Sequence, residues 1–140
     1  MINKAKQTVY YAHSMAMYGT DIEAQDIKML ENNGYKVINP AILELHDMWA
    51  YVDIVYSKAD MVYYRGYTIG VAQEVISALI FKKQVFKCSN KEKITSNDKE
   101  NLISLIINNN FLRKDLFNFK TRYPDYYKSY LNELHLKGGF

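Results

Sequence analysis

Four short apolar runs, each separated from the next by a stretch of helical character, constrain the fold of this chain most. The runs are rich in β-branched and aromatic residues, as buried strands are. They lie at residues 8–12 (TVYYA), 35–38 (YKVI), 59–64 (ADMVYY) and 84–88 (QVFKC). Helices are expected between them over residues 21–33, 42–58 and 70–82. This alternation predicts a parallel sheet with helical crossovers.

Local signals support the helix positions. Thr20 and Glu23 have the spacing of a capping box, and Gly34 suits the left-handed end of the same helix. Asn39-Pro40 closes the second strand, because proline cannot continue a central ladder. In the helix expected over 42–58, apolar residues recur near helical spacing at Leu43, Leu45, Met48, Val52 and Val55.

The chain changes character after Cys88. A polar loop leads to a helix start near Ser96 or Asn97, and a further helix carries Pro124 in its first turn. These helices are too apolar to stand free, so they must cover the sheet or a partner subunit. We expect an α/β fold: a single-domain, Rossmann-like parallel sheet of four or five strands flanked by helices in residues 1–88, with a helical extension in 89–140.

Bulk properties exclude several classes of protein. The chain has 140 residues, enough for one domain, and its net charge of +3 falls short of the dense basic patch of a nucleic-acid binder. Cys88 is the single cysteine, and His13, His46 and His135 lack ligand spacing, so we expect no disulfide, no metal and no cofactor. Without a leader or a membrane-length apolar run, we expect a cytoplasmic protein with no membrane partner.

The 13 tyrosines and the apolar tail predict a homo-oligomer, a dimer or higher.

A ligand site is expected where three loops leave the carboxyl ends of the strands. In open parallel sheets these loops enclose the binding crevice. Here they are HSMAMYG after the first strand, NPAILELHD after the second and RGYTIG after the third. The first free amides of the next helix, near Gly70 and Val71, would favour a phosphate, with Thr68 adding a hydroxyl and Arg65 a charge.

The common nucleotide fingerprints are absent from the sequence. The loop after the first strand is not G-x-G-x-x-G, and no G-x-x-x-x-G-K-[ST] occurs. These absences disfavour an NAD-linked dehydrogenase and a P-loop NTPase. A small nucleotide pocket of another kind remains.

Residues 7 to 88 contain the segments VYYAHSM, GYKVINP and YVDIVYSKADMVYYRGYTIGVAQEVISALIFKKQVF. Their most specific piece is T-x-G-V-x-x-E, from Thr68 to Glu74. In these segments the chain resembles the nucleoside 2-deoxyribosyltransferase-like superfamily, which includes deoxynucleoside 5′-monophosphate N-glycosidases. The resemblance implies an N-glycosidase or glycosyl transferase acting on a nucleoside or nucleotide, and a non-catalytic nucleotide-binding protein of the same fold is the alternative.

The resemblance also implies roles for single residues. Glu74 stands at the catalytic carboxylate, Tyr10 at the tyrosine that positions it, and Asp53 at an aspartate that contacts sugar or base. Ser14 and Thr68, with the backbone at Gly70, stand at positions that hold phosphate. A carboxylate beneath the sugar ring would stabilise the positive charge that builds up there as the N-glycosidic bond breaks.

Each of these residues also has a purely structural interpretation. Glu74 could be a solvated residue beside Gln73 and Ser77, Thr68 only a helix N-cap, and Tyr10 only core packing. His13 is more often a loop histidine satisfied by backbone, although its place beside the crevice keeps it a candidate. Asp21 and Asp26 are expected at the surface.

Overall fold

The protein is an α/β fold built on a four-stranded, all-parallel sheet. The structure, a computed structural model, describes residues 6–136, so the outer ends of the two expected segments, at residues 1 and 140, lie outside it. The strand order is β2-β1-β3-β4. The strands are β1 (Thr8–His13), β2 (Lys36–Ile38), β3 (Met61–Arg65) and β4 (Gln84–Lys87). All four expected strands are present.

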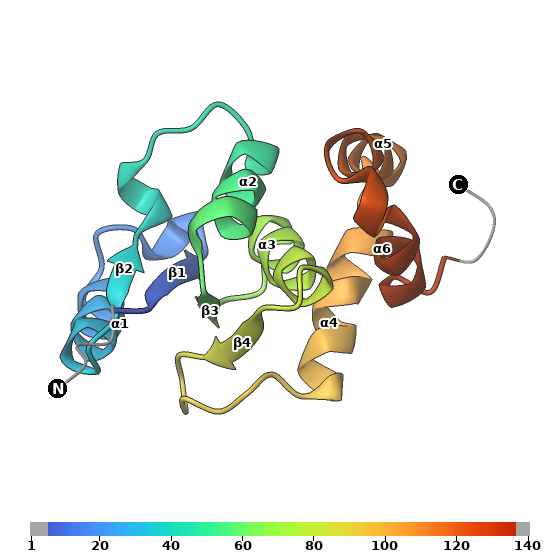
Figure 1. Cartoon of the computed structure of the whole chain (residues 1–140). Helices are drawn as coiled ribbons and strands as arrows, with labels where there is room; N and C mark the ends of the chain where they lie inside the picture. The colour runs from blue at the N-terminus through green and yellow to red at the C-terminus, as the bar shows by residue number, and fades with distance from the viewer. Residues whose placement is uncertain (1–5, 137–140) are drawn as a thin grey trace, which may run out of the picture.

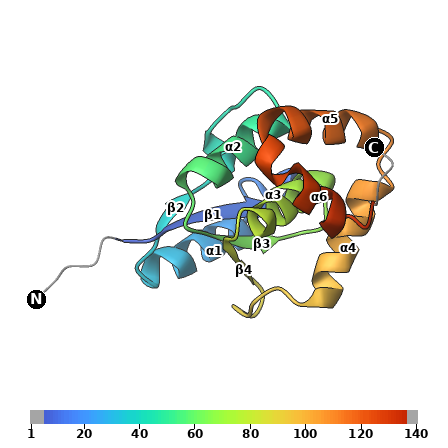
Figure 2. The same ribbon diagram turned by 45° about the vertical axis from the view of Figure 1, so that its right-hand side comes forward.

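The helices form unequal layers on the two sides of the sheet (Figure 1). One face is covered by α1 (Asp21–Asn32) and the other by α2 (Met48–Lys58) and α3 (Ile69–Ile80). Beyond α3 lie α4 (Ser96–Ile107), α5 (Leu112–Arg122) and α6 (Tyr127–Glu133), as a second view confirms (Figure 2). Short 3-10 turns are η1 (Met15–Met17), η2 (Pro40–Ile42) and η3 (Pro124–Tyr126). The C-terminal helices therefore pack on the same chain.

Alternation along the strands divides the core into two clusters. Tyr10 and Val62 face α2 and α3, whereas Tyr11 and Tyr63 pack on the side of α1, in one cluster with its Leu30. Successive strand residues point to opposite faces, so a sheet covered on both sides needs continuous apolar strands. The uninterrupted run TVYYA meets that requirement.

Helix α3 is buried on nearly all sides, because it lies between the sheet and the C-terminal helices. Its polar residues Gln73, Glu74 and Ser77 are all buried. The interpretation of Glu74 as a solvated residue on a polar helix face is therefore wrong. Gln73 and Glu74 hydrogen-bond to tyrosines of other elements, whereas the Ser77 hydroxyl has no hydrogen-bond partner among the described residues.

Helix α2 begins later than expected. The sequence predicted a helix from residue 42, but the chain forms η2 and then a loop through Leu43 and Leu45 before Asp47 caps α2, accepting the Ala50 N–H at 3.0 Å. A side-chain cap fixes the helix start more strongly than apolar spacing does. The loop is thereby left free to line the crevice described below.

Only half of the expected capping box at α1 forms. The Thr20 hydroxyl accepts the Glu23 N–H at 3.3 Å. The Glu23 carboxylate, however, accepts the Gly19 N–H at 3.1 Å and contacts His13 instead of returning to the Thr20 amide. The glutamate thus links α1 to the end of β1.

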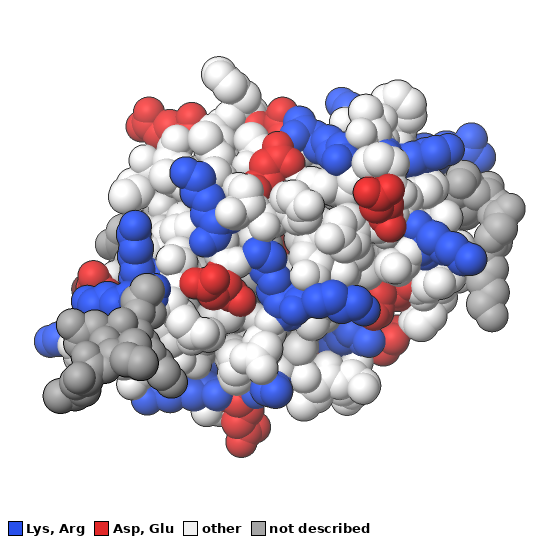
Figure 3. Space-filling model, in the orientation of Figure 1, with Lys and Arg blue, Asp and Glu red and all other residues white. Residues whose placement is uncertain are grey.

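Charged side chains of both signs are mixed over the face shown in Figure 3, with no broad area of one sign. Within residues 6–136, no helix has the length and apolar character needed to cross a membrane.

Candidate functional site

A pocket of about 570 Å³ opens at the carboxyl ends of β1 and β3, where neighbouring connections leave toward opposite faces of the sheet. All three loops expected at the crevice contribute to its wall. Its lining consists of His13, Ser14, Met15, Ala16, Tyr18, Pro40, Leu45, His46, Asp47, Met48, Tyr51, Thr68, Ile69, Gly70, Val71 and Glu74. The structure thus brings the candidate glutamate and the start of α3 to one cavity.

Glu74 and Tyr10 form the polar centre of the site. Glu74, 6% exposed, lies on the second turn of α3 and on the pocket wall. The Tyr10 hydroxyl lies 3.1 Å from each of the two carboxylate oxygens. Tyr10 is fully buried in the central strand β1, so its ring is fixed by the core. The pair is therefore a carboxyl held by a rigid phenol at the edge of a cavity.

Burial shifts the protonation of both groups. It raises the pKa of Glu74 to about 8, against the opposing effect of the hydrogen bond from Tyr10. The pKa of Tyr10 is also raised, first by burial and then by the negative charge of Glu74. Glu74 is consequently mostly protonated at neutral pH in the free protein and titrates just above it.

Two further tyrosines beside Glu74 were missed by the sequence reasoning. Tyr18 lines the pocket, and burial followed by the charge of Glu74 raises its pKa. Tyr51 also lines the pocket, and its hydroxyl accepts the Leu45 N–H at 3.1 Å, which fixes the loop after η2. Tyr18 belongs to HSMAMYG, a loop expected at the crevice, but nothing in the sequence singles out its side chain or that of Tyr51 among 13 tyrosines. Asp47, directly before an apolar helical run, is a recognisable N-cap signal.

The start of α3 provides a polar rim. Thr68 is the N-cap of α3, and its hydroxyl accepts the Val71 N–H at 3.3 Å, as the structural interpretation expected. The prediction that the Val71 amide is free to bind phosphate is therefore wrong, because the cap already engages it. A Cβ at Gly70 would meet only the Thr68 hydroxyl, at 4.0 Å, among described atoms outside its own turn. Gly70 therefore leaves the helix backbone open to the pocket. Such helix starts favour anions through free N–H groups and the helix dipole.

Close contact between two loops places Ser14 in the pocket wall. Gly66 has a φ of +105°, and a Cβ there would lie 3.4 Å from both Cβ and Oγ of Ser14. The glycine is needed for its backbone conformation and lets the loop after β1 lie against the loop after β3. Ser14 and Thr68 thus lie on the two loops that meet at the pocket.

His13 lies at the pocket, but both of its ring nitrogens are engaged elsewhere. Nδ1 lies 2.9 Å from the Tyr11 carbonyl and Nε2 lies 2.7 Å from a Glu23 carboxylate oxygen. The ring also stacks on Tyr11, with centroids 3.9 Å apart. His13 is best described as a support for the loop after β1.

Arg65 is not directed to the pocket. Its Nε and Nη2 bind the two carboxylate oxygens of Asp26 at 2.7 and 2.9 Å. Asp26 also accepts a hydrogen bond from the Tyr11 hydroxyl at 2.5 Å, and its side chain is buried. The prediction that Asp26 lies at the surface is therefore wrong. The buried Asp26 carboxylate needs these hydrogen-bond donors to offset its lost hydration. The Arg65 guanidinium is therefore held at Asp26 and does not reach the pocket.

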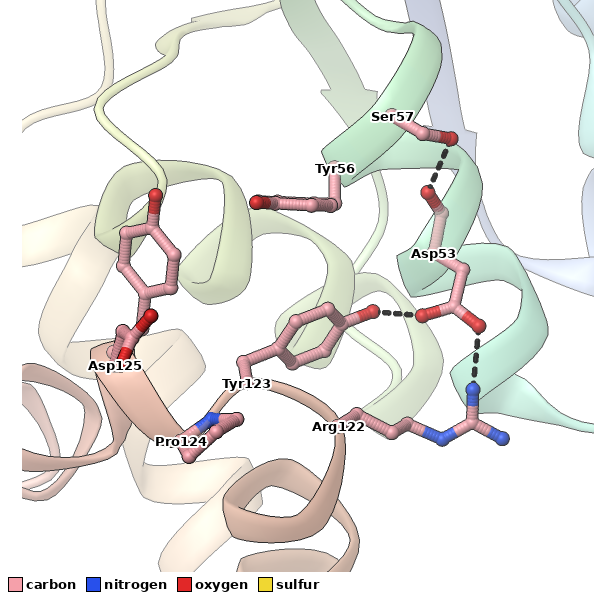
Figure 4. Close-up of a pocket in the computed structure, with 8 residues that line it drawn as sticks. Asp53, Tyr56, Ser57, Arg122, Tyr123, Pro124 and Asp125 are labelled. Atoms are coloured by element: carbon pink, nitrogen blue, oxygen red, sulfur yellow. Dashed lines mark hydrogen bonds and ion pairs between the residues drawn. The ribbon is translucent and has the colours of Figure 1, made fainter.

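Asp53 lies outside this pocket. On the exposed side of α2, its carboxylate binds the Tyr123 hydroxyl and the Arg122 guanidinium (Figure 4). The role of contact to sugar or base, expected for Asp53 from the resemblance, therefore has no support from its position. Within the described lining, the acidic residues at the pocket are Asp47 and Glu74.

The described lining contains neither lysine nor arginine, so attraction of an anion rests on the backbone amides of α3. Among residues 6–136, no group of three or more His, Cys, Asp and Glu side chains is arranged to hold a metal ion. The site is an apolar cavity with one carboxyl–phenol pair on its wall and a helix start at its rim.

Comparisons with models of protein families, with curated proteins and with solved structures found no match to this chain.

Proposed function

We propose that this protein is an N-glycosidase or glycosyl transferase that acts on a nucleoside or nucleotide, with Glu74 as its nucleophile. The single observation that carries the proposal is the buried carboxyl on the wall of a cavity of about 570 Å³, with the Tyr10 hydroxyl 3.1 Å from both of its oxygens. A carboxyl buried without a structural ion pair is unfavourable for folding, so its position indicates a functional role.

The proposed reaction proceeds in two displacements. A Glu74 carboxylate oxygen forms a bond to the anomeric carbon, and the electron pair of the C–N bond leaves with the base, which takes up a proton from solvent. A water molecule, or a nitrogen of a second base, then attacks the anomeric carbon, loses a proton to solvent and displaces the Glu74 carboxylate. Tyr10 would keep the carboxylate oriented through both steps by donating its hydroxyl hydrogen.

The rim of the pocket suits the polar end of such a substrate. A 5′-phosphate would lie against the first turn of α3, where Gly70 exposes backbone, with the hydroxyls of Ser14 and Thr68 nearby. The apolar part of the pocket wall, which includes Met48 and Tyr51, suits the flat face of a nucleobase.

A non-catalytic nucleotide-binding protein is the second candidate, and one observation favours it. Burial raises the pKa of Glu74 to about 8, so at neutral pH the group is largely a neutral acid that donates a hydrogen bond. A neutral carboxyl can recognise a ligand without attacking it. The catalytic account requires a pH-dependent rate that rises as Glu74 ionises.

Release of free base separates the two candidates. The protein is incubated at pH 7 and pH 9 with deoxynucleosides, their 5′-monophosphates, ADP-ribose and cyclic nucleotides, and the products are separated by chromatography. The catalytic proposal predicts base release that is faster at pH 9 and falls by roughly three powers of ten or more in Glu74→Gln. Glu31→Gln, on the exposed side of α1, is the matched control and should retain the wild-type rate. Saturable binding with no base release would instead support the binding protein.

A further inference from the structure

A second hollow, of about 320 Å³, lies between α2 and the chain that joins α5 to α6. Asp53, Tyr56 and Ser57 reach it from one side of α2. Arg122 and the residues of the following turn close the other side (Figure 4). The candidate active site does not account for this hollow, and the two share no lining residue.

The walls of this hollow are aromatic and rigid. Tyr56 is 44% exposed, yet its ring is held 5.4 Å from Tyr123 and 6.0 Å from Tyr126, at angles of 50° and 73° between the planes. Phe81 lies behind all three rings, with centroids 4.8 to 5.2 Å away. Tyr56, Tyr123 and Tyr126 thus line the hollow with their rings at different orientations. Pro124 lies beside Tyr123 (Figure 4). Tyr123 is only 6% exposed, so Tyr56 and Tyr126 present most of the accessible ring surface.

The charge of the lining is negative. Two carboxylates, Asp53 and Asp125, face one guanidinium, that of Arg122. Arg122 is already neutralised, because it binds Asp53 and lies 4.0 Å from Asp47. None of the ion pairs within residues 6–136 involves Asp125. The Lys83 ammonium donates to the backbone carbonyls of Tyr56 in α2 and of Ala59, the residue that follows this helix.

We propose that this hollow binds an alkylated ammonium group. The faces of tyrosine rings attract cations through their quadrupole, and a methylated ammonium presents a positive apolar surface that needs no hydrogen-bond acceptors. Asp125, which forms no ion pair with any residue in 6–136, adds a negative charge to the lining. The group could belong to a small choline-like molecule or to a trimethylated lysine side chain of another protein. This inference is independent of Glu74 and of the proposed reaction.

Titration of the 15N-labelled full chain with tetramethylammonium chloride tests the proposal, with sodium chloride at equal concentration as the salt control. We expect saturable shifts in the amides of residues 53–57, 122, 123, 125 and 126, with a dissociation constant on the order of 1–10 mM. Choline should bind at least fivefold tighter than its neutral isostere 3,3-dimethylbutan-1-ol, because only choline carries the charge. A trimethyl-lysine peptide that binds more tightly than choline identifies a protein partner, and the reverse order identifies a small molecule.

Two substitutions at one position separate ring chemistry from packing. Tyr56→Phe keeps the ring and should bind within about twofold of wild type, whereas Tyr56→Leu keeps apolar volume and should bind at least tenfold more weakly. The dispersion of the amide spectrum shows whether each variant is folded. Equal binding of choline and its isostere, or no saturable shift in the wild-type protein by 50 mM, overturns the proposal whatever the variants do.

Discussion

Glu74 is the residue on which the functional account depends, and its environment explains why sequence alone left its role open. Glu74 differs from an ordinary polar residue of a helix because its side chain is buried on a cavity wall. Its helix, α3, is buried only because α4 and α6, which lie far along the chain, pack against it. The turn motif T-x-G-V-x-x-E indicated where the acid stands. Whether the helix was covered could not be inferred from that motif.

Glu74→Gln should stabilise the protein, and the gain should depend on pH. Burial raises the folded-state pKa from 4.5 to about 8. Between these two pKa values Glu74 ionises in the unfolded chain but stays protonated in the folded protein. The free energy of unfolding of the wild-type protein therefore falls as the pH rises. One pKa unit corresponds to about 1.4 kcal/mol, and we expect a gain of roughly 2–4 kcal/mol at pH 9 but little at pH 4.

Urea unfolding of both proteins at pH 4, 6 and 9 measures this difference. Asp60→Asn provides a control at a carboxylate with an exposed hydrogen bond to the Thr8 amide, and it should not become more stable at high pH. A Glu74→Gln variant that is equally or less stable at pH 9 contradicts the raised pKa.

Gly70→Ala should weaken ligand binding without unfolding the protein. The added methyl meets no packed atom closer than 4.0 Å, and alanine in a helix is favoured over glycine by about 0.5–1 kcal/mol. At the pocket it would block approach to the backbone of α3. Calorimetric titration should show at least a tenfold loss of affinity for a 5′-monophosphate and a smaller loss for the matching nucleoside. Equal losses for the two ligands would place the phosphate elsewhere.

At the scale of elements, a buried polar network ties α3 to the C-terminal helices. The Tyr130 hydroxyl of α6 donates to Gln73 Oε1 at 2.6 Å, and Gln73 Nε2 lies 3.4 Å from Asp115 Oδ2. Asn109 donates to the same Asp115 oxygen at 3.2 Å. Because Gln73 precedes Glu74 directly, this network fixes the part of α3 that carries the candidate nucleophile.

Tyr130→Phe should destabilise the protein by about 1–3 kcal/mol, because it removes a donor from a fully buried amide oxygen. Tyr67→Phe, at a tyrosine that is 55% exposed, is the matched control and should change stability by less than about 0.5 kcal/mol. Urea unfolding at pH 7 compares the two. Equal effects of the two substitutions would show that the network does not hold the helices.

The start of α2 shows which element-level features sequence periodicity fails to predict. Leu43 and Leu45 extend the apolar series of Met48, Val52 and Val55 toward the N-terminus, but they belong to the loop before the helix, and the Asp47 cap determines where the helix begins. The loop itself was expected at the crevice as part of NPAILELHD, so the error concerned only the residue at which α2 begins. Capping residues should therefore take precedence over apolar spacing when the two disagree.

For the molecule as a whole, strand identity and fold class followed from the sequence, because the two central strands, β1 and β3, are apolar runs buried on both faces and the shorter edge strands β2 and β4 are recognisable from their β-branched and aromatic residues. Pairings between distant residues did not. Arg65 meets Asp26 across 39 positions, and Asp53 meets Arg122 across 69. Only the folded chain reveals that Arg65 and Asp53, both candidates for the site, bind partners outside the crevice.

Self-association stays a prediction. The tail was expected to need cover, and its apolar residues, such as Leu102 and Phe119, are buried against the same chain. The exposed large apolar side chains that remain include Met15 at the pocket, with Ile42 and Tyr67 on the neighbouring loops.

Covalent trapping of the sugar is the most direct test of the central claim. A 2-fluoro substituent slows the second displacement, so incubation with 2′-fluoro-arabinonucleosides and their 5′-monophosphates should leave the glycosyl group on the protein. We predict one added sugar by intact-mass spectrometry, located by peptide mapping at Glu74 and absent from Glu74→Gln. A label on another residue, or base release that persists in Glu74→Gln, would contradict the account.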